Sequence, residues 1–261
     1  MPRLRFSIIT PSFNQRQFIE QTGQSILTQI GNFDLTWHVI DGGSTDGTID
    51  YLQSLGDPRI RWISEKDAGQ ADAVNKGLAI ADGDIIGWLN SDDVYAPHAL
   101  EKVRNAFTDE RVQWVVGRYA IVDERGNPIR SAIARYKEWF LSHYTYGRLL
   151  RENFIAQPAV FWRREFGQHA GRLDVNLHYT MDYDLWLRMG KLANPKIRND
   201  VISHFRIHGQ SKSGQVNREQ FDEGYRVAKR YCNGRPISRV MHRFNVEKIV
   251  WAYRVLRVLG I

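Results

Sequence analysis

The 261-residue sequence contains a single cysteine, Cys232, which excludes an internal disulfide framework and is typical of a reducing compartment. No run of 18 uncharged apolar residues is present, and no apolar segment follows Met1 directly. We therefore expect neither a membrane-spanning helix nor a signal peptide. The P-loop pattern and the G-x-G-x-x-G fingerprint are also missing, so these two modes of nucleotide binding are unsupported.

Charge of one sign is in surplus, because 36 Lys and Arg residues outnumber 29 Asp and Glu residues and give a formal net charge of +7. Such a surplus favours anionic partners, namely phosphorylated ligands, acidic lipids or nucleic acids. No helix-turn-helix, zinc-finger or RNP-like signature accompanies it, so no nucleic-acid partner is expected. A hydrophobic content of 43% supports the core of one large domain.

The first half of the chain alternates β-rich segments with segments of helical apolar spacing. This order is typical of an α/β protein with a mostly parallel sheet and helices on its faces. The strands that we expect lie near residues 4–10, 35–40, 59–64, 85–89, 112–122, 153–162 and 201–208, and the helices near 17–29, 49–55, 71–81, 99–107 and from about 182.

Polar or glycine-containing loops follow the first four expected strands. In a parallel sheet these strand ends share one edge, which is where open α/β sheets bind their ligands. The fourth strand, apolar enough for burial on both faces, runs into Asp92 and Asp93. Adjacent carboxylates repel each other unless a cation lies beside them. The residues alone leave open whether this pair binds a divalent metal or only forms a turn.

Four segments resemble the motifs of the family 2 glycosyltransferases and occur in the order of that family. They are Phe6–Asn14, Ile40–Thr48, Asn75–Gly77 and Gly83–Asp93. The resemblance implies the GT-A fold, with a Rossmann-like, mostly parallel central sheet flanked by helices, here followed by a C-terminal helical extension. It also implies an inverting, metal-dependent enzyme that transfers a sugar from a nucleotide-diphosphate donor to an acceptor hydroxyl.

The same resemblance divides the chain by role. Residues 1–110 are expected to bind the nucleotide sugar, and residues 111–215 are expected to complete the same domain with the acceptor site and the catalytic group. Residues 216–261 form the expected extension. The implied partners are a nucleotide-sugar donor and a glycan or lipid-linked acceptor, in bacterial surface polysaccharide or glycolipid assembly. Homo-oligomerisation is left open.

The resemblance also assigns roles to residues of the donor site. Asp93 would bind Mn²⁺ or Mg²⁺, for which hard oxygen ligands are suited. Asp41 lies in the acidic turn, but Gly42 stands where many members have a second acid, which weakens the expected contact with the base. Asp72 and Lys76 also fit an exposed i, i+4 helix pair. The residues expected at the nucleotide sugar are Pro11, Phe13, Asn14, Asp41, Asp67, Gln70, Asp72, Lys76, Asn90, Asp92, Arg206 and Lys212.

A second chemical centre is expected at the start of the helix near residue 182. There the helix dipole stabilises a carboxylate, so Asp182 fits a helix cap as well as a catalytic group. The segment resembles the Glu-Asp motif of the family, with Met181 in place of the glutamate, and this makes Asp182 the expected catalytic base. Gln157 and Asp184 are expected acceptor contacts, although Asp184 also fits a structural role.

Arg206 and His208 precede a Gly/Ser/Lys loop that also contains Lys212. A lone histidine is most often a packed or surface residue. Similar Arg-x-His and Ser-Lys-Ser elements in related sequences nevertheless imply that Arg206 and Lys212 contact the diphosphate, and they make His208 a second expected metal ligand.

Two segments have a composition that fits more than one role. Residues 236–261 are basic and apolar, which fits a helix on an anionic membrane surface as well as a helix packed on the domain or on a partner chain. Residues 131–153 are aromatic and basic, which fits partial burial as well as acceptor binding. The expected location is the cytoplasm, with the inner face of the cytoplasmic membrane as the alternative.

Two other functions compete with sugar transfer. A sugar nucleotidyltransferase uses a related sheet and metal site, but the glycine-rich phosphate loop expected near its first strand is missing here. A non-catalytic module that binds nucleotide sugars would not need Asp93 and Asp182, and both acids are present.

Overall fold

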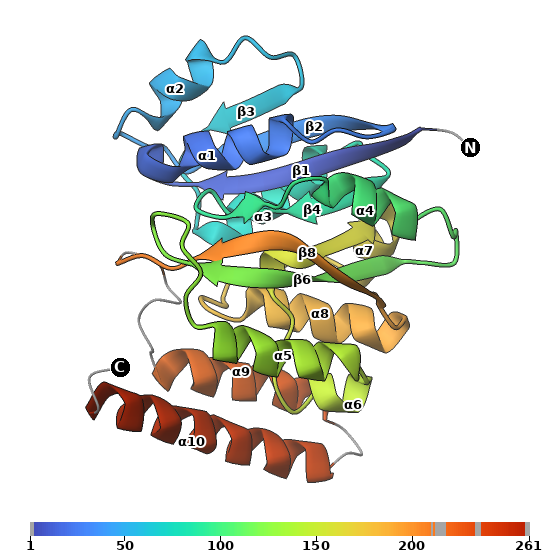
Figure 1. Cartoon of the computed structure of the whole chain (residues 1–261), viewed down its shortest axis with the longest axis vertical. Helices are drawn as coiled ribbons and strands as arrows, with labels where there is room; N and C mark the ends of the chain where they lie inside the picture. The colour runs from blue at the N-terminus through green and yellow to red at the C-terminus, as the bar shows by residue number, and fades with distance from the viewer. Residues whose placement is uncertain (1–2, 210, 212–217, 233–235, 259–261) are drawn as a thin grey trace.

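A computed structural model describes residues 3–209, 211, 218–232 and 236–258, and for residues 236 and 249–258 it describes the helix without its side chains. One mixed sheet organises these residues (Figure 1). Its strands are β1 (Leu4–Ser12), β2 (Phe33–Asp41), β3 (Ile60–Ser64), β4 (Ile85–Trp88), β5 (Val94–Tyr95), β6 (Trp114–Val122), β7 (Val160–Arg163) and β8 (Lys196–Arg206). Within the described chain, the eight strands lie in the order β3-β2-β1-β4-β7-β6-β8-β5.

The sheet is mostly parallel, as the sequence predicts. β3, β2, β1 and β4 are paired in parallel, and β6 and β8 form a second parallel pair. β7 is antiparallel to both β4 and β6, and β5 is antiparallel to β8. Six of the eight described strands therefore share one direction, and the strands before and after residue 110 belong to the same sheet.

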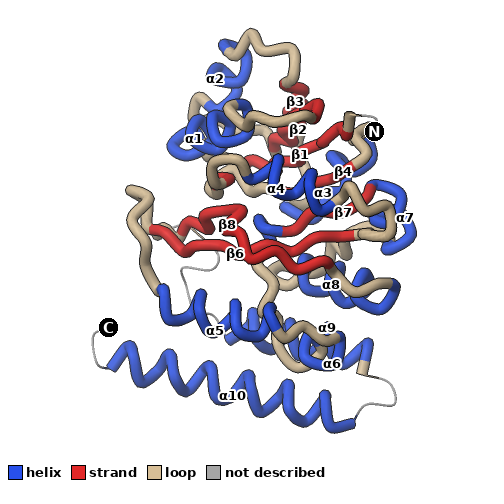
Figure 2. The backbone as a smooth tube through the Cα atoms, turned by 45° about the vertical axis from the view of Figure 1, so that its right-hand side comes forward, coloured by secondary structure: helices blue, strands red, loops and turns tan. Residues whose placement is uncertain are grey.

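Helices cover both faces of this sheet (Figure 2). They are α1 (Arg16–Leu27), α2 (Thr48–Ser54), α3 (Gln70–Ile80), α4 (Ala99–Ala106), α5 (Ser131–Ser142), α6 (Tyr146–Leu149), α7 (Arg164–Ala170), α8 (Met181–Leu192), α9 (Arg218–Tyr231) and α10 (Pro236–Val258). Buried side chains of α1 and α4 form a core on one face, and those of α3, α7 and α8 form a core on the other. The helices α5, α6, α9 and α10 lie at the end of the molecule opposite α2.

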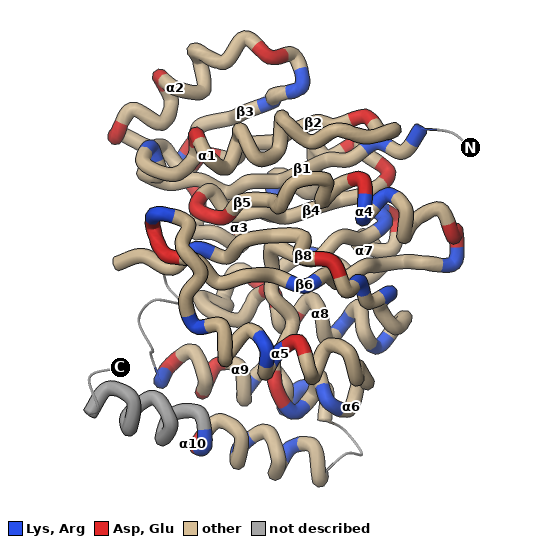
Figure 3. Tube along the Cα trace, in the orientation of Figure 1, with Lys and Arg blue, Asp and Glu red and all other residues tan. Residues whose placement is uncertain are grey.

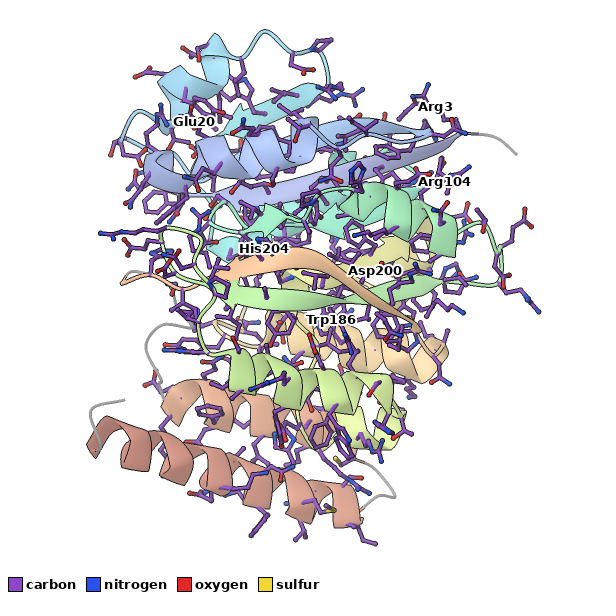
Figure 4. The ribbon with its side chains drawn as sticks, viewed as in Figure 1. Arg3, Glu20, Arg104, Trp186, Asp200 and His204 are labelled. Atoms are coloured by element: carbon purple, nitrogen blue, oxygen red, sulfur yellow. The ribbon has the colours of Figure 1, made fainter. Side chains whose placement is uncertain are left out.

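The local sequence explains how closely these layers approach. All four residues of β4 are buried, as expected for a strand covered on both faces. Gly77 lies in the middle of α3, where glycine costs about 1 kcal/mol relative to alanine. A Cβ atom at this position would lie 2.4 Å from Cγ2 of Ile9, so only glycine lets α3 pack on β1 at this distance. On α8, Trp186 packs against Trp114 and Trp162 beneath the sheet (Figure 4).

The structure corrects one expectation about local structure and adds two helices that were not predicted. The strand expected near residues 153–162, entered from a loop and interrupted at Pro158, is shorter than expected, because Gln157–Ala159 forms a 3₁₀ turn and β7 begins only at Val160. No element was predicted for residues 131–153, which form α5 and α6. Only two α5 residues, Ala134 and Leu141, are buried, so this helix lies largely at the surface. In the part of the chain that the structure describes, no helix combines the length and the apolar character needed to cross a membrane.

Candidate active site

A cleft of about 930 Å³ opens where the carboxyl ends of several strands meet. Its walls come from the loops after β1, β3 and β4, from the end of β8 and the start of α8, and from α5, α9 and α10. The loops after three of the first four predicted strands thus converge, as a parallel sheet requires. The C-terminal helices complete the wall on the side of α5.

Most residues singled out in the sequence line this cleft. These are Pro11, Phe13, Asp67, Gln70, Asn90, Asp92, Gln157, Asp182, Arg206 and His208. The lining does not include Asn14, Asp41, Asp72, Lys76, Asp93 or Asp184. Lys212 lies outside the described residues.

The Phe13 ring, with 59% of the residue exposed, lies at the end of the cleft formed by the loop after β1. Gly42 lies beside it. A Cβ atom at residue 42 would be 2.8 Å from Oδ2 of Asp67 and 3.3 Å from the Phe13 ring. The Asp67 carboxylate therefore occupies the space that a side chain at position 42 would need. An acid from the loop after β3 therefore lies beside position 42.

Asp41 and Asn14 join the loops that support this end of the cleft. The buried carboxylate of Asp41 accepts the backbone N–H of Ser44 at 2.8 Å and the hydroxyl of Ser64 at 2.7 Å. Asn14 has a left-handed backbone with a φ of 51°, and its Oδ1 atom accepts the N–H of Thr45 at 2.9 Å. Both polar side chains are therefore engaged within the protein. Asn14 fixes the loops after β1 and β2 to each other, and Asp41 fixes the loop after β2 to the end of β3.

Asp72 and Lys76 form the i, i+4 helix pair that the sequence allowed. The Nζ atom of Lys76 lies 2.8 Å from Oε1 of Glu65 and 3.6 Å from Oδ2 of Asp72. The Asp72 carboxylate also accepts the N–H of Ala68 at 3.0 Å, just before α3 begins. These contacts stabilise the first turns of α3 and the loop before it.

The neighbouring acids Asp92 and Asp93 point to different surroundings. Asp93 is fully buried, and its Oδ1 atom accepts the N–H of Arg206 at 2.8 Å. Burial, and then the nearby charge of Asp92, raise the pKa of Asp93 well above its usual value. Asp92 faces the cleft instead, and its Oδ2 atom lies 3.0 Å from Nε2 of His208. No three His, Cys, Asp or Glu side chains converge as a metal cage among the residues placed in the structure.

Arg206 brings an incompletely satisfied cation to the cleft wall. Only 3% of the residue is exposed, and its guanidinium lies 4.9 Å from the ring centre of Phe18. Nη2 donates to Oε1 of Gln21 at 2.7 Å, but Nε and Nη1 have no acceptor among the described residues. Burial lowers the pKa of Arg206, although the charges of Asp93 and Asp92 oppose this effect. Buried donors without acceptors are costly, so an anion bound here would stabilise the site.

A chain of side-chain hydrogen bonds forms the floor of the cleft. Oδ1 of Asn90 accepts Nε2 of Gln70 at 2.8 Å and Nε1 of Trp88 at 2.9 Å. Its Nδ2 atom donates to Oε1 of Gln157 at 3.0 Å. These bonds fix the amide orientation of Asn90. They also connect Gln70 and Asn90, which were predicted to bind the nucleotide sugar, to Gln157, which was predicted to bind the acceptor substrate.

Asp182 lies in the first turn of α8, half-buried and on the wall of the cleft. Burial raises its pKa to about 6, against the opposing effects of the Tyr183 N–H and of the Lys137 charge. The N-cap residue is Thr180, so Asp182 is not the helix cap that the sequence left open. A carboxylate with a pKa near 6 is largely ionised at neutral pH and basic enough to accept a proton.

Glu223 on α9 is a site residue that the sequence did not reveal. Its buried carboxylate accepts the backbone N–H groups of His178, Tyr179 and Thr180 at 3.1, 2.8 and 2.8 Å, and the Thr180 hydroxyl at 2.8 Å. These residues directly precede Asp182. Nothing in the spacing of residues 216–235 indicated this contact, because it joins segments more than 40 residues apart.

Asp184 faces away from the lining of the cleft and connects two helices. Its Oδ2 atom lies 3.0 Å from Nε of Arg188, and its Oδ1 atom accepts the Tyr231 hydroxyl at 2.7 Å. The residue is 4% exposed. It thereby fixes α8 against α9, which is the structural role that the sequence allowed.

Solved glycosyltransferase structures share this fold. The TarS fragment 1–349 from S. aureus, in complex with UDP-GlcNAc, superposes with a TM-score of 0.69 at 16% identity, over 88% of this chain and 67% of that one. The mannosyltransferase PcManGT from Pyrobaculum calidifontis, in complex with GDP-Man and Mn²⁺, gives a TM-score of 0.67 at 15% identity, over 99% of this chain and 81% of that one. The fold is therefore that of the GT-A glycosyltransferases.

Sequence comparison identifies the family. The model described as "Glycosyl transferase family 2" matches residues 7–166, and the chain belongs to this family. A putative teichuronic acid biosynthesis glycosyltransferase of Bacillus subtilis, TuaG, is 30% identical over 95% of this chain and 92% of its own length. The chondroitin synthase of Escherichia coli is 28% identical over 79% of this chain and 29% of its own length. The chain spans only 35% of an uncharacterized glycosyltransferase of Rickettsia conorii that is 25% identical over 81% of this chain.

Proposed function

We propose that this protein is an inverting glycosyltransferase that moves a sugar from a nucleoside-diphosphate donor to a hydroxyl of a glycan or lipid-linked acceptor. One observation carries the proposal. The half-buried carboxylate of Asp182, with a pKa of about 6, lines the same cleft as the Phe13 ring and the Asp92–His208 pair. A base, a stacking surface and a pair of side chains suited to a divalent cation in one cleft are what transfer from a nucleotide sugar requires.

The donor would lie along the edge formed by the loops after β1, β3 and β4. In this arrangement the base stacks on Phe13 beside Pro11, and Asp67 takes the place of the acid missing at position 42. The buried donors of Arg206 contact the diphosphate. Two solved relatives in fold bind UDP-GlcNAc and GDP-Man respectively, so the fold accommodates different bases. Asn14 and Asp41 act in this proposal by shaping the loops.

A divalent cation fits the Asp92–His208 pair better than it fits Asp93. A carboxylate and an imidazole face the cleft together, with side chains 21% and 3% exposed, whereas the Asp93 carboxylate accepts a backbone N–H beneath them. The remaining ligands would be oxygens of the diphosphate and water. When bound, Mn²⁺ or Mg²⁺ would neutralise negative charge on the departing diphosphate. The prediction that Asp93 is the ligand stays untested, and we favour Asp92.

Asp182 would remove the proton from the acceptor hydroxyl as its oxygen attacks the anomeric carbon. The bond to the nucleotide breaks on the opposite side of that carbon, which inverts its configuration. Asp182 accepts the proton, and Arg206 stabilises charge on the leaving diphosphate. Glu223 holds the segment before α8, and this fixes the position of the base.

The acceptor and the location follow from two further features. The TuaG and chondroitin synthase names point to polysaccharide assembly, and we propose the same process for this chain.

Helix α10 buries Ser238 and Val246 against the domain and exposes Val240 and Phe244 on its other face. We propose that this exposed face lies on an anionic membrane surface at the cytoplasmic side, where lipid-linked acceptors are found.

A screen of UDP-, GDP- and dTDP-sugars with and without Mn²⁺ tests the central proposal. We expect one donor to raise the melting temperature only with the metal, and to be hydrolysed slowly to the nucleoside diphosphate. Release of pyrophosphate from a nucleoside triphosphate would indicate a nucleotidyltransferase instead. Binding of a donor without any hydrolysis or transfer would indicate a non-catalytic module.

A further inference from the structure

Part of the cleft lining lies outside the edge where we propose that the donor binds. The lining there includes Tyr136 and Lys137 of α5, Arg151 and Glu152 of the loop after α6, and Lys248 of α10. Both views of the backbone place α5 and α10 at the end of the molecule opposite β3. Lys and Arg positions occur on α5, α9 and α10 at this end (Figure 3).

Cations in this region are arranged around a buried acid. The Tyr136 hydroxyl donates to Oε2 of Glu152 at 2.9 Å and accepts from Nζ of Lys248 at 3.3 Å. Lys248 also lies 5.5 Å from the centre of the Tyr136 ring. Burial raises the pKa of Glu152, and the charges of Lys137 and Lys248 oppose this effect. Lys137 therefore lies close enough to influence both Glu152 and the base Asp182.

Arg151 adds a donor that the described protein atoms leave unsatisfied. Its Nε atom is buried and has no acceptor among the described residues, although its backbone carbonyl accepts Nδ2 of Asn245 on α10. Lys137 and Lys248 thus act on the Glu152 carboxylate, and Arg151 adds a third cationic side chain to the same part of the cleft lining. Three cationic side chains against one carboxylate leave an excess of positive charge in this part of the cleft, and the buried Nε of Arg151 still needs an acceptor.

We propose that this region is an acceptor subsite for an anionic group, a carboxylate or a phosphate, held by Lys137, Arg151 and Lys248. The inference rests on the proposed function, because it takes Asp182 as the base that separates donor from acceptor. The acceptor sugar would lie between Asp182 and α10, with its hydroxyl on the base and its anion on the three cations. Because α10 supplies Lys248, the C-terminal extension is part of the substrate site.

Three methyl glucosides that differ only at C6 test the subsite. Methyl β-glucoside is neutral, methyl β-glucuronide carries a carboxylate, and methyl β-glucoside 6-phosphate carries a phosphate. Their affinities for the full chain, saturated with nucleoside diphosphate and Mn²⁺, are measured by calorimetry. We expect at least one anionic glycoside to bind about tenfold more tightly than the neutral one, as charge-assisted contacts to two or more cations allow. The glycoside that binds more tightly shows whether the subsite takes a carboxylate or a phosphate.

The double variant Lys137→Met/Lys248→Met should lose this preference and bind the neutral glycoside as before. Lys229→Met is the matched control, because Lys229 is exposed on α9 and does not line the cleft. It should keep the preference. Anionic glycosides that bind the wild type no better than the neutral one overturn the inference, and so does a double variant that retains the preference. Failure of every nucleotide to bind overturns the proposed function instead, and the calorimetry records it separately.

Discussion

The Oδ2 atom of Asp92 lies 3.0 Å from the Nε2 atom of His208, although 116 residues separate the two in the chain. The loop after β4 supplies the aspartate, and the segment after β8 supplies the histidine. The imidazole lies against the Phe18 ring, with 4.5 Å between ring centres, which restricts its orientation. Because no third His, Cys, Asp or Glu side chain of the described residues joins this pair, a cation bound there would need oxygen ligands from the nucleotide, and cation binding and nucleotide binding should depend on each other.

The first prediction concerns this pair. Asp92→Asn and His208→Ala should each weaken Mn²⁺ binding to the nucleotide-saturated enzyme about tenfold or more, because each removes one protein ligand. Manganese titration followed by electron paramagnetic resonance measures the loss. Asp72→Asn, outside the cleft, is the control. If Asp93→Asn abolishes Mn²⁺ binding while Asp92→Asn preserves it, the ion lies at Asp93 and our placement is wrong.

Asp182→Asn should abolish most of the transfer activity without weakening the binding of the donor. The amide keeps the shape of the carboxylate but cannot accept the proton, so kcat should fall about 10²- to 10⁴-fold. The affinity for the nucleotide should stay within about twofold, because the proposed donor contacts do not involve this residue. Initial rates of sugar transfer at saturating substrate give kcat, and calorimetry gives the affinity for the nucleotide. Turnover close to that of the wild type would show that another group is the base.

The pH dependence of transfer should follow the ionisation of Asp182. Its pKa is raised to about 6, and the base acts only when deprotonated. The value of kcat/KM should therefore rise with pH up to about 6 and level off above it. The same shift makes ionisation unfavourable for folding, so stability should fall as the pH rises from about 4 to 6, by at most about 3 kcal/mol. Asp182→Asn should remove this fall, which thermal denaturation across that pH range measures.

Much of the fold and about half of the site could be predicted from the sequence, and the limits are physical. β4 and α3 were found because burial on both faces and helical spacing leave strong patterns. Phe13 and Asp92 directly follow two of the strands and line the cleft, and it was the resemblance to the family 2 glycosyltransferases that placed them at the nucleotide sugar. The sequence could not show which of the two adjacent aspartates is buried and which faces the cleft, because the burial of Asp93 depends on its hydrogen bond to the backbone N–H of Arg206. It could not show that Asp67 fills the space beside Gly42 either.

The exposed face of α10 gives a prediction about membranes. Val240 and Phe244 are 69% and 68% exposed on this face, where Arg239 and Arg243 lie nearby in the sequence. The full chain should float with vesicles that contain phosphatidylglycerol and not with vesicles of phosphatidylcholine alone. Val240→Asp/Phe244→Asp should abolish flotation, because it places two charges in the apolar face. Ile30→Asp, at a residue that is 73% exposed after α1, should have no effect. Flotation that persists in the double variant would assign membrane binding to another surface.

The last prediction tests whether Glu223 positions the base. Burial raises the pKa of Glu223, but the N–H groups of Tyr179, His178 and Thr180 together lower it further than burial raises it, so the residue holds this segment as an anion. Glu223→Gln turns one acceptor oxygen into a donor that faces N–H groups. We expect kcat to fall about 10- to 100-fold, with the donor KM unchanged, because a displaced base loses reactivity more than binding.

If Glu223 had only a structural role, Glu223→Gln would lower the stability of the protein and leave the pH profile of kcat/KM unchanged. Its negative charge also raises the pKa of Asp182, so Glu223→Gln should move the acidic limb of kcat/KM to lower pH. Glu219→Gln, one turn earlier on an exposed part of α9, should change neither kcat nor the limb. A Glu223→Gln enzyme with a reduced melting temperature but the wild-type kcat and pH profile would reduce this residue to a contact between α9 and the segment before α8. The combined fall in kcat and shift of the limb would instead show that the C-terminal extension sets both the position and the basicity of Asp182.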